Sequence, residues 1–233
     1  MQINGAVALV TGANRGLGRH FAAQLLARGA AKVYATARRP ELVELPGAEV
    51  LRLDITDPAS VAAAQQAAGD VTLLVNNAGV ATGTELISGD LEGVRRELDT
   101  HFWGTLTVIR AFAPQLTDGA IVNVLSVLSW AASPGNGAYA AAKAAEWNLT
   151  NAVRLELAAQ RTQVTGVFLG AADTDMAAGH DVPPDLLTDP AVIVRAALDG
   201  LEAGQWEVLA DPTAAMVKGS LAGDPQAFYA AVQ

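Results

Sequence analysis

The chain has 233 residues, of which 51% are hydrophobic and 17% charged, and its formal net charge at pH 7 is −9. This length and composition fit one compact core and exclude a disordered chain, while the acidic charge argues against nucleic acid as a partner. The lack of cysteine excludes disulfides, thiolate metal ligands and cysteine nucleophiles, and we predict no metal site.

The predicted elements are short apolar strands that alternate with longer helices. Strands are expected at residues 7–11, 32–36, 50–53, 72–76, 120–124, 164–169 and 206–209. Helices are expected at residues 17–27, from Asp57-Pro58, and at 91–116, 139–159 and 191–201. The Asp-Pro pair recurs at Asp189, Asp211 and Asp224, and it is typical of a helix start.

These strands are apolar along their whole length, as in a parallel sheet that helices cover on both faces. We therefore predict an α/β fold with a doubly wound, seven-stranded, mostly parallel sheet in a single domain over residues 1–233. Ligands of such sheets bind at the carboxyl ends of the strands. The segment 171–188 has no clear periodicity, and we predict that it is a lid over the site.

A glycine-rich turn, with Gly12, Gly16 and Gly18, follows the first strand and opens the first helix. Backbone N–H groups at such a helix start can meet a pyrophosphate, helped by the helix dipole. A purely structural turn is the alternative. The order of strand, turn and helix favours a dinucleotide site.

The end of the second strand carries arginines instead of the carboxylate that binds the ribose 2′-hydroxyl of NAD. Arg38 and Arg39 lie there, and Arg15 lies in the glycine turn. Guanidinium groups match phosphate oxygens, so we predict NADPH/NADP+ as the cofactor, although Arg39 fits a surface charge equally well. Asp54, after the third strand, either binds the adenine amino group or caps a helix.

Tyr139 and Lys143 are four residues apart and share one face of a predicted helix. A positive charge about 4 Å away is worth roughly 4 kcal/mol at an effective dielectric of 20, enough to bring a phenol pKa from near 10 toward neutrality. Lys143 together with the cationic oxidised nicotinamide is expected to supply this charge. Ser126 follows the fifth strand and can hold a substrate oxygen. Each residue alone also fits a structural role, but together they predict hydride transfer between a nicotinamide and a carbonyl or alcohol carbon.

Over nearly its whole length the chain resembles the short-chain dehydrogenase/reductase family. The resemblance rests on Thr11-Gly12-x-x-x-Gly16-x-Gly18, Asn76-Asn77-Ala78-Gly79, Ser126, Tyr139-x-x-x-Lys143 and Thr174. It implies a Rossmann-like domain in which Asn76 supports the central strand, Tyr139 is the general acid in reduction and Ser126 polarises the carbonyl. It also implies that Lys143 holds the nicotinamide ribose and lowers the pKa of Tyr139. The cofactor-binding residues it implies are Gly12, Asn14, Arg15, Gly16, Leu17, Gly18, Arg38, Asp54, Ile55, Asn77, Ala78, Gly79, Tyr139, Lys143, Gly170 and Thr174.

Two positions depart from the family pattern. His101 stands where the family has an asparagine that anchors a water between the lysine and solvent. That water passes protons between the lysine and solvent. With an ordinary pKa near 6.5, His101 either carries these protons itself or packs in the helix and leaves the proton transfer impaired. We interpret it as a catalytic-site residue and expect His101→Asn to keep activity but alter the pH–rate profile. Leu169 replaces a proline before Gly170, which affects the shape of the loop entrance.

Substrate selectivity is expected to come from residues 80–84, residues 128–136 and the lid. Their mostly small, apolar side chains predict a ketone, aldehyde or secondary alcohol without multiple charges. Trp130 either forms a wall of this pocket or packs in the core. His180 is interpreted as a solvated lid residue.

The predicted function is NADPH-dependent reduction of a ketone or aldehyde. An NADP-dependent alcohol dehydrogenase working in the oxidative direction and a non-catalytic NADPH-sensing regulator are the alternatives. The chain has no stretch typical of a signal peptide or a membrane span, so we expect no membrane contact and a cytoplasmic location. A homo-oligomer, dimer or tetramer, is also expected, and Phe102, Trp103 and Trp147 fit either its interface or the core.

Overall fold

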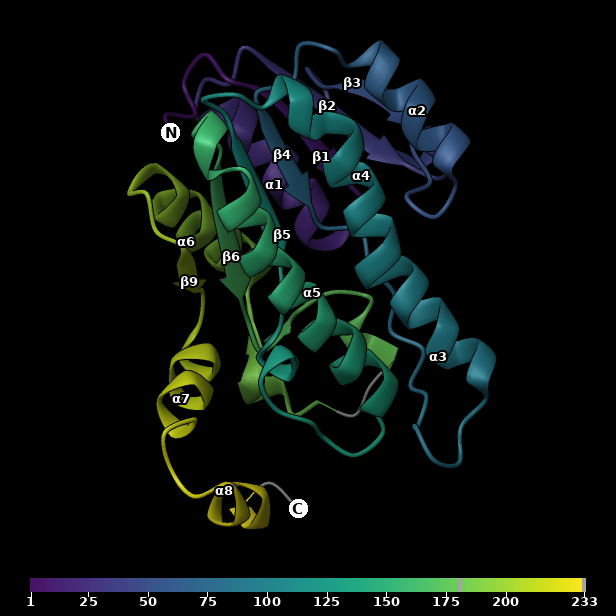
Figure 1. Cartoon of the computed structure of the whole chain (residues 1–233), viewed down its shortest axis with the longest axis vertical. Coiled ribbons are helices and arrows are strands. Elements are labelled where there is room, and N and C mark those ends of the chain that lie inside the picture. Colours follow the sequence, from purple (N-terminus) through teal and green to yellow (C-terminus); the bar gives the residue numbers. More distant parts are fainter. Residues whose placement is uncertain (180–181, 232–233) are drawn as a thin grey trace.

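The protein is described by a computed structural model that covers residues 1–179 and 182–231. Its centre is a seven-stranded sheet with the order β3-β2-β1-β4-β5-β6-β9, in which every neighbouring pair is parallel. Helices cover both faces of the sheet (Figure 1). The predicted doubly wound, Rossmann-like α/β fold is therefore confirmed.

The elements follow the predicted order closely. The strands of the large sheet are β1 (Val7–Thr11), β2 (Lys32–Ala37), β3 (Glu49–Arg52), β4 (Leu73–Asn76), β5 (Ala120–Val124), β6 (Gln163–Phe168) and β9 (Glu207–Leu209). The helices are α1 (Gly16–Ala27), α2 (Pro58–Ala67), α3 (Leu91–Leu98), α4 (Thr105–Phe112), α5 (Gly137–Glu156), α6 (Pro190–Glu202), α7 (Pro212–Ser220) and α8 (Pro225–Ala231). Within the described residues, no helix is long and apolar enough to cross a membrane.

Two apolar cores lie on opposite faces of the sheet. Successive strand residues point to opposite faces, so Ala8 and Val10 of β1 join one core while Leu9 joins the other. Helices α1 and α6 close the first core, and α2, α4 and α5 close the second. Each fully buried leucine or phenylalanine contributes about 1.5–3 kcal/mol, so the apolar strands and helix faces account for the layered arrangement.

The strand order reverses between β1 and β4, which are neighbours at the centre of the sheet. The chain runs from β1 to β2 and β3 on one side and from β4 to β5 and β6 on the other. The loops that follow β1 and β4 therefore diverge and leave a crevice at the carboxyl ends of the strands. This topology brings the glycine turn after β1 beside the Asn77–Gly79 segment after β4.

The Asp-Pro pairs open helices, as predicted. The carboxylates of Asp57, Asp189, Asp211 and Asp224 each accept a hydrogen bond from a backbone N–H in the first turn of α2, α6, α7 and α8. Each aspartate satisfies one of the N–H groups that a helix start leaves unpaired. The proline in the next position gives up no helical hydrogen bond, because an N–H at the first position of a helix has no partner within the helix.

Asp57→Ala is expected to lower the free energy of unfolding by about 1 kcal/mol, because it removes the cap on Ala59 N at 3.0 Å. Urea unfolding of the variant and the native protein measures this difference. Glu44→Ala, which removes an exposed carboxylate from a loop, is the control and should change stability by less than about 0.5 kcal/mol. An equal decrease in the free energy of unfolding in the two variants contradicts the capping role of Asp57.

The predicted long helix at 91–116 is helical but not uniform. Between α3 and α4 the chain forms a six-residue π-helix, η2 (Asp99–Gly104), and a short 3₁₀ turn follows α4. This 3₁₀ turn ends at Gln115, and Asp118 in the turn that follows has a left-handed φ of 59°, in agreement with the predicted stop at Asp118-Gly119. A π-helix widens the helical turn and often occurs at functional sites. Here it contains His101.

Candidate active site

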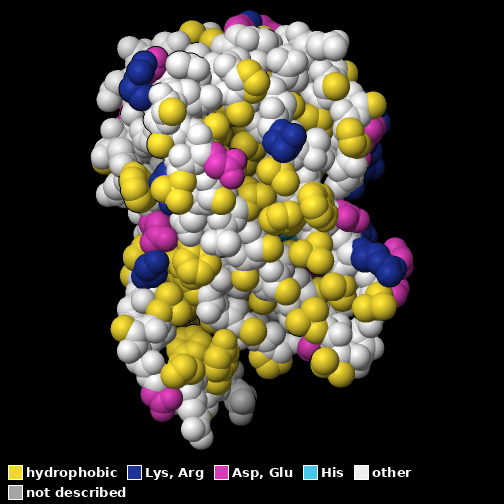
Figure 2. All heavy atoms as spheres, in the orientation of Figure 1, with side chains coloured by type: hydrophobic (Ala, Val, Ile, Leu, Met, Phe, Trp, Pro, Cys, Tyr) yellow, Lys and Arg dark blue, Asp and Glu magenta, His cyan; other side chains and the backbone are white. Residues whose placement is uncertain are grey.

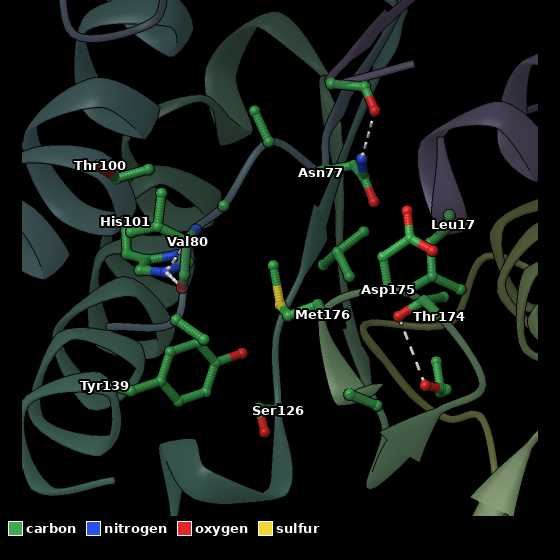
Figure 3. A pocket seen from close by; sticks show the side chains of 18 of the residues that line it. Leu17, Asn77, Val80, Thr100, His101, Ser126, Tyr139, Thr174, Asp175 and Met176 are labelled. Carbon is green, nitrogen blue, oxygen red and sulfur yellow. Dashed lines mark hydrogen bonds between the residues drawn. The ribbon is translucent and has the colours of Figure 1, made fainter. Parts of the chain in front are cut away.

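A cavity of about 680 Å³ lies at the carboxyl ends of β1, β4 and β5. It is lined by nearly all the residues that the sequence marks as functional: Gly12, Asn14, Arg15, Gly16, Leu17, Arg38, Asp54, Ile55, Asn77, Ala78, Gly79, His101, Ser126, Tyr139, Lys143, Gly170 and Thr174. Gly18 lies behind this lining in the first turn of α1. Figure 3 shows side chains from both halves of the sheet facing the same space.

The glycine turn has the backbone shape that a pyrophosphate needs. Gly12 and Gly16 have φ values of 69° and 52°, which side-chain-bearing residues rarely adopt. A Cβ on Gly18 would overlap the carbonyl oxygen of Gly12 and lie 2.5 Å from Asn77 Nδ2. No side chain of the described residues caps the start of α1, so its N–H groups stay accessible to an anion. The turn therefore fits the diphosphate of a dinucleotide.

Hydrogen bonds lock the ends of β1 and β4 together behind this turn. The Thr11 hydroxyl accepts from the backbone N–H groups of Asn77 and Ala78 at 2.9 and 3.0 Å, and Asn77 Nδ2 donates to Thr11 O at 2.9 Å. Asn76 is buried and donates to Asn123 Oδ1 on β5 at 2.8 Å. The Asn76–Gly79 segment thus supports the central strands and forms one wall of the cavity, as the family resemblance implies.

The arginine side chains gather at the mouth of the cavity. Arg15, Arg38 and Arg39 line it, and Arg15 forms an ion pair of 3.1 Å with Asp175 of the predicted lid. Both partners of this pair are exposed, so it contributes little stability and leaves Arg15 available to a phosphate. This arrangement fits the 2′-phosphate of NADPH.

The structure excludes one of the two roles that the sequence left open for Asp54, and adenine binding stays a prediction. Its carboxylate accepts hydrogen bonds from the N–H and hydroxyl of Thr56 at 3.0 and 2.8 Å, whereas Asp57 caps α2. The helix-cap alternative for Asp54 is therefore wrong. Asp54 closes a tight turn and lines the cavity beside the arginines.

Tyr139 and Lys143 lie on successive turns at the start of α5, and Ser126 lies opposite them after β5. Lys143 Nζ is 5.8 Å from the centre of the Tyr139 ring, and it donates to Val124 O at 2.8 Å. Ser126 Oγ accepts from Leu128 N at 3.1 Å, which fixes the serine in a 3₁₀ turn. Tyr139 and Ser126 line the same cavity, and the Tyr139 hydroxyl points toward its middle (Figure 3).

Burial raises the pKa of the Tyr139 phenol, and the positive charge of Lys143 opposes this effect. The carboxylates of Glu146 and Glu97 add to the increase, so the pKa lies above the ordinary value of 10.0. Lys143 has the predicted influence on the pKa of Tyr139, and the further decrease expected from the positive charge of an oxidised nicotinamide stays a prediction. Burial and the charge of Glu146 arise from the tertiary packing around Tyr139 and are not contained in the Tyr139–Lys143 spacing.

His101 lies beside Tyr139 and is almost completely buried. The two rings meet edge to face with their centres 5.2 Å apart, and His101 Nε2 lies 2.9 Å from Val80 O. A Cβ on Gly79 would come within 2.7 Å of the imidazole, so the glycine of the Asn-Asn-Ala-Gly motif makes room for this histidine. The position agrees with a site-lining residue, and its proton-carrying role stays a prediction.

Two buried carboxylates near His101 were missed by the sequence argument. Glu97 Oε2 lies 3.3 Å from His101 Nε2, and Glu146 Oε2 lies 3.6 Å from His101 Nδ1 and 2.7 Å from Lys143 Nζ. Their helical spacing was a usable signal, because Glu97 precedes His101 by four residues and Glu146 follows Lys143 by three.

The remaining predictions concern the substrate side of the cavity. Leu128, Val80 and Met176 line it, in agreement with the segments predicted to set selectivity. Trp130 instead stacks on Phe168 with ring centres 4.0 Å apart, so it is a packing residue. His180 lies outside the described residues.

The structure places two of the three aromatic residues that were predicted for either an interface or the core. Phe102 and Trp147 pack against the core, whereas the Trp103 side chain is exposed. Figure 2 shows hydrophobic side chains gathered on the lower half of the visible face. The predicted homo-oligomer stays a prediction.

Comparison with known proteins agrees with this geometry. The family model "short chain dehydrogenase" matches residues 6–182. The chain is 34% identical over 195 residues to an NADPH-dependent 1-acyldihydroxyacetone phosphate reductase of Schizosaccharomyces pombe, covering 79% of this chain but only 64% of that relative. It is 37% identical over 185 residues to a D-erythrulose reductase of Gallus gallus, covering 76% and 75% of the two chains.

A solved structure resembles the whole molecule. It is a short-chain dehydrogenase from Burkholderia cenocepacia in complex with NADP, with a TM-score of 0.94, 40% sequence identity and coverage of 100% of this chain and 99% of that one. The family match spans the glycine turn, Ser126, Tyr139 and Lys143, the same residues that meet in the cavity. The chain therefore belongs to the short-chain dehydrogenase/reductase family.

Proposed function

We propose that the protein reduces a ketone or aldehyde to an alcohol with NADPH, and that Tyr139 is the general acid. The observation that carries this proposal is the meeting of Ser126, Tyr139 and Lys143 in one cavity with the glycine turn. A protein that only senses a nucleotide has no need of a proton donor and a carbonyl-binding hydroxyl beside the nicotinamide end of its site.

When bound, the cofactor supplies the hydride. The chain supplies the rest: the Ser126 hydroxyl donates a hydrogen bond to the carbonyl oxygen, and the Tyr139 hydroxyl gives that oxygen its proton as negative charge develops there. Lys143 places a positive charge 5.8 Å from the centre of the phenol ring, which stabilises the tyrosinate left behind. Proton transfer from a positioned acid of this kind accelerates reactions about 10²- to 10⁴-fold.

Burial and its neighbours keep the Tyr139 phenol protonated at neutral pH, which is the form that acts as the acid in reduction. Because burial holds the pKa of Tyr139 above 10.0, the phenol keeps its proton below that pH and is ready to donate it. In the oxidative direction the same residue acts as a base and must first lose its proton. The ratio of NADPH to NADP+ sets the direction of the reaction, so the alcohol dehydrogenase stays the alternative.

The described parts of the predicted lid contribute to the substrate side. Residues 171–179 and 182–188 include Thr174, Met176 and Leu186, which line the cavity. We propose that these residues contact the substrate. Thr174 is also a predicted cofactor contact, and the lid carboxylate Asp175 pairs with Arg15, so the apolar side chains of Met176 and Leu186 support a carbonyl compound with little charge.

Absorbance of NADPH during incubation with a panel of ketones and aldehydes tests the function. The expected result is carbonyl-dependent loss of NADPH by the native protein. Tight NADPH binding without turnover of any compound supports the sensor instead. Assays with NADP+ and secondary alcohols, run at neutral and alkaline pH, compare the two directions.

Arg38→Ala is expected to weaken NADPH binding about 10- to 100-fold, because a charge-assisted hydrogen bond to phosphate is worth about 1.5–3 kcal/mol. NADH lacks the 2′-phosphate, so its affinity should change little. Quenching of protein fluorescence by each cofactor measures both dissociation constants. Arg15→Ala should have a similar effect, and Arg110→Ala, on the exposed side of α4, is the control. Equal affinity of the native protein for NADH and NADPH contradicts the NADPH preference.

A further inference from the structure

Four charged side chains form a continuous buried cluster beneath Tyr139. We call Glu97, His101, Lys143 and Glu146 the inner charge cluster. None of the four side chains is more than 7% exposed. The cluster joins three elements, since Glu97 belongs to α3, His101 to η2, and Lys143 and Glu146 to α5.

Glu146 is the link between the other members. Its Oε2 atom accepts from Lys143 Nζ at 2.7 Å and lies 3.6 Å from His101 Nδ1, while its Oε1 atom accepts from the Thr105 hydroxyl at 3.2 Å. The carboxylate is therefore held from α4 as well as by its own helix. Among the described residues, His101 Nδ1 has no hydrogen-bond partner within normal distance, so the Glu146 carboxylate is its nearest counter-charge.

The position of Lys143 follows from these contacts. Its ammonium group has three N–H bonds, of which one points to Val124 O and one to Glu146 Oε2. The third remains for a group in the cavity that Lys143 lines. A lysine on a flexible stem has no fixed direction by itself, so the two acceptors determine where the third N–H points.

The charges of the cluster balance when His101 is protonated. Burial lowers the pKa of His101 and Lys143 lowers it further, but the carboxylates of Glu146 and Glu97 outweigh both and raise it above the ordinary value of 6.5. Burial raises the pKa of both glutamates, yet their cationic partners bring each below its ordinary value. Two cations and two anions then share the buried space, as a stable buried cluster requires.

Other groups also face His101. Tyr139 of α5 meets the imidazole edge to face, and the Val80 carbonyl lies 2.9 Å from Nε2 on the loop after β4. The Thr82 N–H donates to the other oxygen of Glu97 at 2.6 Å, which favours the ionised carboxylate. Among the described residues, Glu97, Glu146, Lys143 and Tyr139 are thus the titratable groups around His101.

We propose that Glu146 is a positioning residue that aims Lys143 at the cavity, and that His101, held as a cation by Glu97 and Glu146, offsets the negative charge that Glu146 places near Tyr139. The proposal rests on the proposed carbonyl reduction. It assigns His101 a fixed charge in place of the water-binding role of the usual asparagine. It also adds two acidic residues, Glu97 and Glu146, to the groups that determine the pH at which Tyr139 loses its proton.

The charge of His101 can be measured without turnover. The chain has three histidines, so NMR of protein with labelled histidine gives three titration curves, and the signal lost in His101→Asn identifies the one of interest. We expect the pKa of His101 to lie above 6.5 and to fall by about 1 or more in Glu146→Gln, which keeps the shape of the residue but removes its charge. A neutral His101 at pH 6, or the same curve in both proteins, overturns the proposal.

The kinetic test uses the pH dependence of kcat/KM for carbonyl reduction, which falls as Tyr139 loses its proton. In Glu146→Gln a negative charge near Tyr139 is gone, so this fall should move to lower pH by about one unit. His101 acts on this fall only while its imidazole is still protonated at the pH where Tyr139 loses its proton. In His101→Asn the fall should then move to higher pH, and an unmoved profile contradicts the offsetting role of His101. The double variant removes one charge of each sign and should return toward the native profile, with a smaller loss of stability than the two single variants together.

Two further variants, one control on the same helix and one that shortens the Glu146 side chain, separate a positioning role from structural support alone. Glu156→Gln, exposed near the end of α5, is expected to leave the profile unchanged. Glu146→Ala, which removes the acceptor altogether, should lower kcat about 10-fold or more at the pH optimum with a smaller change in KM. A loss of melting temperature in the Glu146 variants without any movement of the profile contradicts the positioning role. Absence of turnover by the native protein contradicts the proposed function itself, while the NMR curves still report on the cluster.

Discussion

Replacing Tyr139 with phenylalanine is expected to lower kcat/KM for carbonyl reduction about 10³-fold, because the variant lacks the proton that the developing alkoxide requires. The phenol is the acidic hydroxyl at the base of the cavity, next to Ser126 and one helical turn from Lys143. Ser126 can still hold the carbonyl oxygen, but a serine hydroxyl has far too high a pKa to replace the acid. Water in the cavity then remains as the proton source, which explains a residual rate.

The loss should be confined to catalysis. Phenylalanine keeps the ring and therefore keeps the edge-to-face contact with His101 at 5.2 Å, so neither the fold nor NADPH affinity should change much. Steady-state kinetics and an NADPH titration of the same preparation measure the two properties. Tyr34→Phe is the matched control, since its hydroxyl bonds Lys32 and Asp70 away from the cavity. Turnover that survives the loss of the Tyr139 hydroxyl contradicts the mechanism.

Gly18→Ala is expected to weaken NADPH binding about 100-fold and to lower the free energy of unfolding by about 1–3 kcal/mol. The new methyl group would overlap the carbonyl oxygen of Gly12 and come within 2.8 Å of the carbonyl carbon. Both are backbone atoms, so no side-chain rotation relieves the clash. The first turn of α1 must move away from the glycine turn, and the N–H groups that fit the pyrophosphate move with it.

The same displacement should disturb Asn77. In the native structure its Nδ2 atom donates a hydrogen bond to Thr11 O, and in the variant this atom would lie 2.5 Å from the new methyl group. Fluorescence titration with NADPH and urea unfolding measure the two effects separately. Gly219→Ala in α7 is the control, because open space surrounds that position and alanine favours a helix by up to about 1 kcal/mol. Native NADPH affinity in Gly18→Ala contradicts the proposed use of the glycine turn.

The sequence alone determined those features whose causes act over a few residues. The apolar runs at 7–11 and 120–124 match β1 and β5 residue for residue, because both faces of these strands are buried and a glycine marks one end of each, Gly12 after β1 and Gly119 before β5. The Asp-Pro pairs predicted four helix starts because the cap and the proline act on the first turn of their own helix. The spacing of Tyr139 and Lys143 placed both on one helix face for the same local reason.

The tertiary structure decided which distant groups meet and which of them lose water. His101 and Glu146 are 45 positions apart in the sequence, and only the packing of η2 against α5 brings Nδ1 within 3.6 Å of the carboxylate. Trp130 similarly became a packing residue through contact with Phe168 on another element. The pKa of Tyr139 depends on burial and on Glu97 and Glu146, which a local pattern does not contain. Desolvation and charge pairing are properties of the assembled core, and for this reason the sequence identified the reacting groups whereas the fold set their electrostatic environment.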